Sequence, residues 1–285
     1  MTTNPPPPGI PEIKLSYPTP SILLITINRP KDLNCMNSTM NHYLHALYTW
    51  YDAQPSLLCA ILTGTGRAFC AGADLKEWNA SHEKPPSTNT NTDTNTSAAL
   101  SSMPPSGFGG LSRRSGKKPV ICAVNGLCLG GGCEMVINAD MVVADRQRAV
   151  FGLPEVKIGV VALAGALTRL TRTVGRQRAM EMALTGRALS ADEARDWGLV
   201  NRVVDGGEVV AEAVRLAESV CANSPDSVIV SREGVKLGWE GVGAEEGTRQ
   251  LMELWYGRID KGDNMKEGVR SFVEKRKPKW VASKL

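Results

Sequence analysis

Two glycine-rich junctions, each between a predicted strand and a possible helix start, carry the residues best suited to chemistry. The first covers 64–75, and the second covers 125–134, in which three glycines and a cysteine precede Glu134. Small residues allow a backbone N–H to approach a ligand oxygen closely, and a helix that begins there favours negative charge. Two N–H groups that converge from the two junctions would form an oxyanion hole for a carbonyl oxygen.

Glu134 and Glu155 are the candidate acid–base residues. Glu155 lies in the motif Phe-Gly-Leu-Pro-Glu at 151–155. Two carboxyl groups that share a confined site have coupled, separated titrations, which holds one as an acid and one as a base. Other interpretations stay open: the glycines allow tight helix–strand packing, Glu134 suits a helix start, and Glu155 suits an exposed turn. The residue pattern by itself does not bring the two glutamates together.

Motifs for several other chemistries are missing from the sequence. Neither junction has the spacing of a dinucleotide site, and no phosphate-binding P-loop motif is present. His42 and His45 lack an evident third ligand, so we expect no metal. A serine hydrolase is not indicated, because there is no Gly-x-Ser-x-Gly motif and only three histidines. The seven cysteines form no Cys-x-x-Cys pair and are interpreted as reduced thiols: Cys35, Cys59, Cys70, Cys122, Cys128, Cys133 and Cys221.

Composition indicates a globular chain with an ordinary core. The 285 residues are 42% hydrophobic and 22% charged, with a formal net charge of +4, which does not suggest a nucleic-acid partner. No apolar run approaches about 18 residues, so we expect no membrane span. The N-terminal segment lacks a secretory or mitochondrial pattern. Ser283, Lys284 and Leu285 match the tripeptide read by a peroxisomal import receptor, and we therefore expect a peroxisomal location.

Hydrophobic patterning predicts an α/β chain. Apolar, β-branched runs predict buried strands at 21–28, 57–63, 119–124 and near 140–144. Asn37 or Ser38 can cap a helix whose apolar positions are Met40, Leu44, Leu47 and Tyr51. After residue 165 the chain is mostly helical, and Ser190 with Glu193 forms a capping box for 191–197. Further amphipathic helices are expected at 207–222, 225–237, 243–259 and 263–276.

This pattern divides the chain into four parts. We expect a flexible Pro-rich lead at 1–16, a core at 17–206, C-terminal helices at 207–276 and a free tail at 277–285. Within the core, 82–116 has the composition of a low-complexity loop that is mobile up to Lys117.

Four sequence blocks, in order, resemble the enoyl-CoA hydratase/isomerase (crotonase) superfamily. They are GxAFCAGADLKE, KKPVICAVNGLCLGGGCE, FGLPEVKIG and GRQRAMEMALTG, and the similarity covers about 17–276. The resemblance implies a spiral of ββα units with a C-terminal helical trimerisation region, and a homotrimer or homohexamer. It also implies an acyl-CoA substrate, with coenzyme A arriving as part of that substrate and no permanently bound cofactor.

The resemblance also implies a role for individual residues. The oxyanion-hole amides fall on Ala73 and Gly131, and the hydratase glutamates fall on Glu134 and Glu155. One glutamate then accepts a proton from the water that attacks the β carbon, and the other supplies a proton to the α carbon. Expected coenzyme A contacts are Lys31, Ala71, Asp74, Leu75, Lys76 and, from a neighbouring subunit, Lys275.

One loop departs from the family pattern. Typical hydratases have Pro-Gly-Ala-Gly-Gly after the second glutamate, whereas this chain has Leu163 where a glycine amide helps to hold the catalytic water. A leucine there needs room and restricts φ. Fungal peroxisomal relatives of siderophore or toxin pathways look similar in this loop, so hydration or dehydration could serve secondary metabolism or fatty-acid oxidation. Alternatives are a Δ3,Δ2-enoyl-CoA isomerase and an RNA-binding protein on the same scaffold.

Overall fold

A six-stranded sheet forms the larger layer of the molecule. The computed structural model describes residues 5–82 and 103–285. The strand order is β1-β2-β3-β5-β7-β10; β1 and β2 are antiparallel, and the other neighbours are parallel. Parallel strands need apolar residues on both faces, which the predicted runs supply. The strands are β1 Ile13–Thr19, β2 Ile22–Ile27, β3 Cys59–Gly64, β5 Val120–Val124, β7 Met141–Asp145 and β10 Arg202–Val204.

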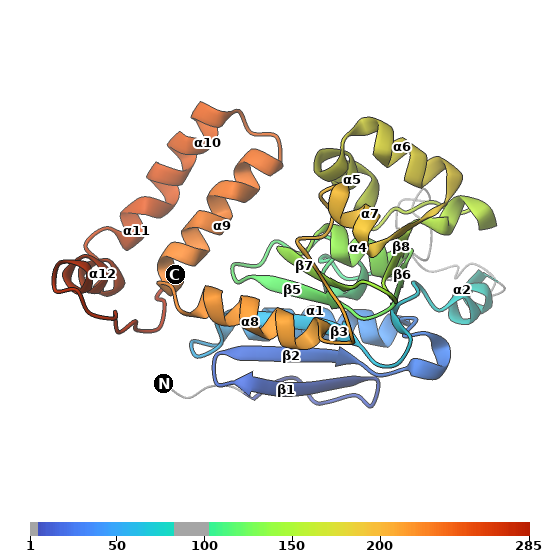
Figure 1. Ribbon diagram of the computed structural model, residues 1–285, viewed down its shortest axis with the longest axis horizontal. Helices are drawn as coiled ribbons and strands as arrows, with labels where there is room; N and C mark the ends of the chain where they lie inside the picture. Colours follow the sequence, from blue (N-terminus) through green and yellow to red (C-terminus); the bar gives the residue numbers. More distant parts are fainter. Residues whose placement is uncertain (1–4, 83–102) are drawn as a thin grey trace, which may run out of the picture.

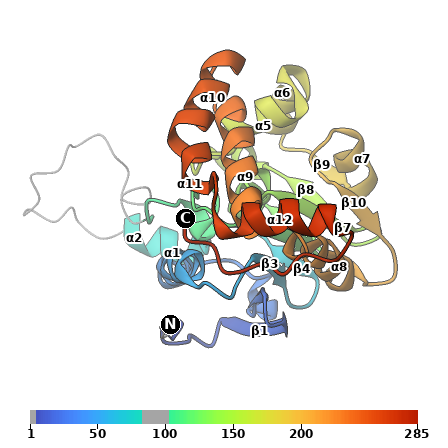
Figure 2. The same ribbon diagram turned by 90° about the vertical axis from the view of Figure 1, so that its left-hand side faces the viewer.

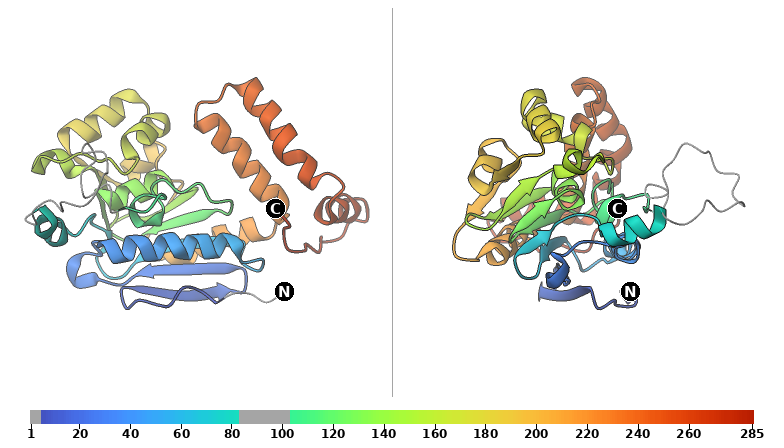
Figure 3. Two further views of the ribbon diagram at one scale, coloured as in Figure 1. Left: turned by 180° about the vertical axis from the view of Figure 1, so that it is seen from behind. Right: turned by 90° about the vertical axis from the view of Figure 1, so that its right-hand side faces the viewer.

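Two helices cover the two faces of this sheet. Helix α1 (Ser38–Ala53) packs against the face that carries Leu23 and Ile25, whereas α8 (Val209–Cys221) packs against the face that carries Ile22. The alternation along β2 follows from the two-residue repeat of a strand. Figures 1 and 3 show α8 and α1 on opposite sides of the sheet. Asn37 caps α1 by accepting a hydrogen bond from the Met40 amide at 2.9 Å, which confirms the predicted helix start.

A second sheet of four short strands completes the core. Its order is β4-β6-β8-β9, with β4 Ala68–Cys70, β6 Leu127–Leu129, β8 Val150–Gly152 and β9 Ala188–Ser190. Each long strand β3, β5 and β7 leads into one of the short strands β4, β6 and β8. A helix or helical turn then follows, namely α2 (Leu75–His82), α4 (Gly131–Ile137) and η3 (Pro154–Ile158). The expected ββα units are therefore present.

The remaining helices lie C-terminal to these units. Helix α7 begins after Ser190, which accepts a hydrogen bond from the Glu193 amide, as its predicted cap requires. Helices α9 to α12 extend away from the core (Figures 1 and 2). The bounds are α5 Ala166–Val174, α6 Arg176–Thr185, α7 Ala191–Asp196, α9 Pro225–Trp239, α10 Ala244–Leu251, α11 Gly257–Ile259 and α12 Asp263–Val273. Short turns are η1 Pro30–Asp32 and η2 Phe108–Gly110, and η4 Met252–Tyr256 is a π-helix. No helix of the described residues is long and apolar enough to cross a bilayer.

Two predicted boundaries were wrong. Strand β1 begins at Ile13, so the last residues of the expected lead at 1–16 belong to the sheet. Of the expected loop at 82–116, 83–102 lies outside the described residues, and 103–116 is not a free loop. Phe108, Leu111 and Ser112 are at most 2% exposed. Apolar burial and closure of backbone hydrogen bonds outweigh the loop-like composition of this segment.

The expected free tail at 277–285 is also packed against the protein. The Trp280 indole donates to the Ala222 carbonyl at 2.8 Å, and Val281 exchanges hydrogen bonds with Asn264. The Lys284 ammonium contacts Asp263 at 2.7 Å, and Lys117 donates to the Leu285 carbonyl oxygen. These contacts hold the last residues beside α8 and α12 (Figure 2) and beside Lys117, which precedes β5.

Candidate active site

The two glycine-rich junctions of the sequence lie side by side in the structure. A β-carbon added to Gly72 would lie 3.6 Å from the Gly131 nitrogen and 3.3 Å from the Leu129 carbonyl oxygen. Gly72 has a φ of +109°, which L side chains rarely adopt. A β-carbon at Gly132 would lie 2.1 Å from the Cys70 carbonyl oxygen. Glycine is therefore required for the β4–α2 and β6–α4 junctions to approach each other.

The backbone amides of Ala73 and Gly131 lie at the two junctions. The Met36 amide donates to the Gly72 carbonyl and the Asp74 amide donates to the Met36 carbonyl, both at 2.9 Å, which leaves the Ala73 amide between them unused. Gly131 is the first residue of α4, where an N–H lies outside the helical ladder. Among residues 5–82 and 103–285, neither amide donates to an acceptor. Two adjacent free N–H groups suit a partly negative oxygen.

Glu134 is a buried residue in α4, three positions after Gly131. The residue is only 4% exposed, and its carboxylate oxygen Oε2 accepts a hydrogen bond from the Ala166 amide at 3.0 Å. Burial raises the pKa of Glu134 to about 7, against the opposing effect of the Ala166 hydrogen bond, and the charge of Glu155 raises it further. Glu134 is thus poised to exchange a proton near neutral pH.

Glu155 faces the same junction from η3. A β-carbon added to Gly130 would lie 3.4 Å from the Glu155 Oε1, so this carboxylate lies next to the Gly131 amide. Glu155 Oε2 is buried and has no hydrogen-bond partner among the described residues. Burial raises the pKa of Glu155 above its ordinary value. The structure therefore brings both predicted glutamates close enough together that the charge of Glu155 raises the pKa of Glu134.

The raised pKa of Glu134 predicts a measurable pH dependence of stability. Because the folded protein favours the protonated carboxyl, its contribution to stability is present below about pH 4.5 and is lost as pH rises through about 7. Glu134→Gln stays neutral at every pH. We therefore expect its free energy of unfolding to rise by roughly 3 kcal/mol relative to that of wild type as the pH increases from about 4.5 to above 7. Urea unfolding between pH 4.5 and 8 measures this difference. Glu212→Gln, on α8, is the control, and an unchanging difference for Glu134→Gln would contradict the burial argument.

Leu163, in the loop after η3, is an exposed residue. Its side chain is 56% exposed, and it is not among the residues with positive φ, whereas its neighbours Ala162 and Ala164 are buried. The loop thus accommodates leucine by directing its side chain to the surface. The exposed position of the side chain explains how the chain tolerates leucine where the family has glycine.

The predicted coenzyme A contacts are divided between two regions. Lys31, Leu75 and Lys76 are exposed near the β4–α2 junction. The Ala71 amide donates to the Leu33 carbonyl, and Asp74 forms an ion pair with Arg29 at 3.1 Å, which lowers the pKa of Asp74. Asp74 therefore has a structural role in holding this junction. Lys275 follows α12, at the opposite end of the molecule from α2 (Figure 1), so a single chain does not bring it to the others.

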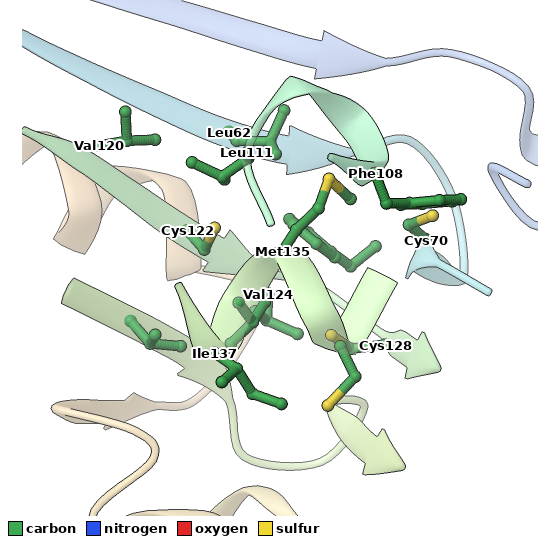
Figure 4. Close-up of a cluster of buried hydrophobic side chains, with 14 of the residues drawn as sticks. Leu62, Cys70, Phe108, Leu111, Val120, Cys122, Val124, Cys128, Met135 and Ile137 are labelled. Carbon is green, nitrogen blue, oxygen red and sulfur yellow. The ribbon is translucent and has the colours of Figure 1, made fainter. Parts of the chain in front are cut away.

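Three further residues contact the junction or the loop before α5 and were missed by sequence reasoning: Phe108, Ser112 and Arg169. A β-carbon added to Gly131 would lie 2.7 Å from the ring of Phe108, so this ring covers the residue that carries the second amide. Figure 4 shows Phe108 in one apolar cluster with Cys70 and Met135. Ser112 and Arg169 hold the loop before α5. The Gly-Phe-Gly-Gly motif could have marked Phe108, but the low-complexity composition around it hid the signal.

The chain belongs to the enoyl-CoA hydratase/isomerase family, whose sequence model matches residues 19–283. It is accordingly an enzyme of the CoA-hydratase class, a group of lyases that act on CoA thioesters. It is 55% identical over 286 residues to the mevalonyl-coenzyme A hydratase SIDH of Beauveria bassiana, covering 100% of both chains. It is 51% identical to the mevalonyl-coenzyme A hydratase sidH of Aspergillus fumigatus, covering 95% of both.

Solved structures show the same fold. The enoyl-CoA hydratase of Mycobacterium tuberculosis H37Rv superposes with a TM-score of 0.82 at 34% identity, covering 96% of this chain and 100% of that one. The enoyl-CoA hydratase EchA1 of Mycobacterium marinum gives the same TM-score and coverage at 35% identity. The crotonase-like α/β fold expected from the sequence is therefore confirmed.

Proposed function

We propose that the enzyme interconverts a 2-enoyl-CoA and a 3-hydroxyacyl-CoA at the Ala73–Gly131 junction. The two amides bind the thioester oxygen and stabilise the enolate, so that charge develops against fixed donors. One of the paired glutamates, Glu134 and Glu155, exchanges a proton with water or the β-hydroxyl, and the other exchanges a proton with the α carbon. The observation that supports this mechanism best is the Glu155 carboxyl group beside Gly130, close enough for its charge to act on the buried Glu134 carboxyl group. The chain's own groups suffice, so we expect no resident cofactor.

The names of two relatives indicate which acyl group the substrate carries. Two fungal relatives that match nearly the whole chain carry the name mevalonyl-coenzyme A hydratase. We infer that this enzyme takes an acyl group with a methyl and a hydroxyl group on the β carbon, and that secondary metabolism is its setting. Removal of water from such a tertiary alcohol gives a conjugated, branched enoyl thioester.

A substrate panel tests the proposed reaction. Purified protein is incubated with mevalonyl-CoA, a straight-chain 3-hydroxyacyl-CoA and crotonyl-CoA while the absorbance of the conjugated enoyl thioester is followed. We expect kcat/KM to be highest for the branched substrate. Turnover of crotonyl-CoA alone would overturn the acyl assignment, and turnover of none, with CoA-ester binding established, would overturn the reaction itself.

Exposed apolar side chains support an oligomer. Val269, Phe272 and Val273 on α12 are 64%, 86% and 74% exposed in the single chain. Burying them against a second copy would stabilise the assembly. We infer a homotrimer or homohexamer in which Lys275 from one subunit reaches the coenzyme A of another. Sedimentation of wild type and Phe272→Asp measures the state, and a stable wild-type monomer would contradict it.

Residues Ser283 to Leu285 support a peroxisomal location and an import-receptor partner. A fluorescent reporter that ends in residues 274–285 should be punctate and should coincide with a peroxisomal marker. The same reporter without Leu285 should be diffuse. A reporter that is diffuse with the complete tail, or that coincides with mitochondria, would contradict this location.

A further inference from the structure

The segment at 103–116 forms one wall of the active site. Phe108 lies against Gly131, and the Gly109 amide donates to the Asn41 Oδ1 at 2.6 Å, which anchors the segment on α1. Gly109 and Gly110 both have positive φ, and a β-carbon at Gly110 would lie 2.6 Å from the His45 nitrogen. The wall is therefore closely packed against α1.

Ser112 joins this wall to the loop that contacts Glu134. Its side chain is fully buried, at 0% exposure. Its hydroxyl accepts a hydrogen bond from the Phe108 amide and donates one to the Ala164 carbonyl, each at 2.8 Å. A β-carbon at Gly107 would lie 2.4 Å from this hydroxyl oxygen, so glycine leaves the space that it occupies. One buried hydroxyl thus contacts both sides of the site.

The loop on the other side of this bridge holds Glu134 through its backbone. The Ala166 amide donates to the Glu134 carboxylate, and hydrogen bonds from Ala166 and Ala164 lower the pKa that burial raises. Between them, Gly165 has a φ of +124°. Arg169 binds the Gly165 carbonyl at 3.2 Å and also the Asn138 side chain at 3.0 Å. The loop conformation is therefore fixed by Ser112 at Ala164 and by Arg169 at Gly165.

We propose that Ser112 is a positioning residue of the reaction: its hydroxyl fixes the Ala164–Ala166 backbone against Glu134 and, through Phe108, the wall over Gly131. This inference rests on the proposed function, since it assigns a role within the same site. The hydroxyl touches neither substrate nor a reacting atom. It acts by holding the Ala166 amide, which donates to the Glu134 carboxylate, and the Phe108 ring, which lies against Gly131.

The charges around Glu134 define the expected change in pH dependence. Glu155 raises the pKa of Glu134, whereas Arg169 and the loop amides lower it. Arg113 also adjoins the loop, because a β-carbon at Gly165 would lie 3.1 Å from its side chain. Without the hydrogen bonds of the Ser112 hydroxyl, the Ala164 and Ala166 amides are held less firmly against the Glu134 carboxylate, while the charges of Glu155, Arg169 and Arg113 remain. The pKa of Glu134 then moves upward from about 7.

The kinetic test compares Ser112→Ala with Tyr51→Phe. The Tyr51 hydroxyl is also buried and also donates to a backbone carbonyl, that of Pro119, at 2.9 Å. We expect Ser112→Ala to lower kcat/KM by roughly 10-fold to 100-fold. The limb of the pH profile of kcat/KM that reports the ionisation of Glu134 should move to higher pH. Tyr51→Phe should lose a comparable amount of thermal stability with an unchanged profile. An unmoved limb in Ser112→Ala would reduce Ser112 to a structural role and overturn the proposal.

A second variant and a second measurement separate the alternatives. Ser112→Cys fills nearly the same volume with a weak hydrogen-bonding group, so it should resemble Ser112→Ala; a wild-type profile would show that volume, not the hydrogen bond, matters. Hydrogen exchange of peptides covering 160–167 should be faster in both Ser112 variants than in Tyr51→Phe. This readout needs no turnover. If wild type acts on no thioester, the proposed function fails, whereas unchanged exchange defeats the Ser112 inference alone.

Discussion

Glu155→Gln is expected to lower kcat by about 10²–10⁴-fold, with KM changed by only a few fold. Glutamine has nearly the same shape as glutamate but cannot transfer a proton. Because Glu155 Oε2 has no hydrogen-bond partner among the described residues, the substitution breaks no hydrogen bond of that atom within them. Loss of the charge also removes its effect on Glu134, whose pKa should fall from about 7. The defect should therefore lie in the chemical step.

Steady-state kinetics with the preferred thioester measures this effect. Glu212→Gln is the matched control, since Glu212 pairs with Arg202 and Arg215 on the far side of the sheet. Glu134→Gln should give a loss of similar size, and the double variant should lose much less than the product of the two because the pair acts as a unit. A Glu155→Gln enzyme with more than half of the wild-type kcat would exclude this residue from proton transfer.

Ala73→Pro is expected to lower kcat/KM by about 10²–10³-fold, which corresponds to roughly 2.7–4 kcal/mol of lost transition-state stabilisation. Proline removes the backbone N–H, which no ordinary side-chain substitution can do. The neighbouring hydrogen bonds use the Gly72 carbonyl and the Asp74 amide, so neither needs the Ala73 amide. The substitution therefore removes one of the two proposed donors while the bridge to Met36 can persist.

A folding control is necessary because proline also restricts its surroundings. Ala244→Pro introduces proline at the first position of α10, where the N–H is likewise outside the helical ladder. Circular dichroism and thermal melts of both variants report the fold, and enoyl thioester absorbance reports the activity. Near-wild-type kcat/KM in a folded Ala73→Pro protein would show that this amide does not bind the thioester oxygen.

The long strands and helix α1 were predictable because their signals are local. Strand β3 is a continuous apolar run, and Asn37 is a strong cap for the residues that follow. Strands β4, β6 and β8 have only three residues each, so contacts with neighbouring strands decide their existence. Strand β1 was missed because Pro18 argues against a central strand; an edge strand tolerates proline.

The candidate site was predictable in part. Glycine at 72 and 132 has a physical reason that sequence could suggest, but only coordinates show the close approach of the two junctions. The pairing of Glu134 with Glu155 came from resemblance, since they lie in separate elements joined by tertiary packing. Ser112 gave no signal, because its hydrogen bond to Ala164 spans 52 positions of the chain.

The C-terminal tail is bound to the surface of the enzyme, so Ser283 to Leu285 are accessible only in the fraction of molecules in which the tail has detached. Lys117 and Asp263 retain the final residues on the enzyme's own surface. For a receptor that reads Ser283 to Leu285, apparent affinity equals intrinsic affinity multiplied by the detached fraction. Chains that have not yet folded their C-terminal helices would present the tripeptide without this competition, so the order of folding and receptor capture would set the efficiency of delivery.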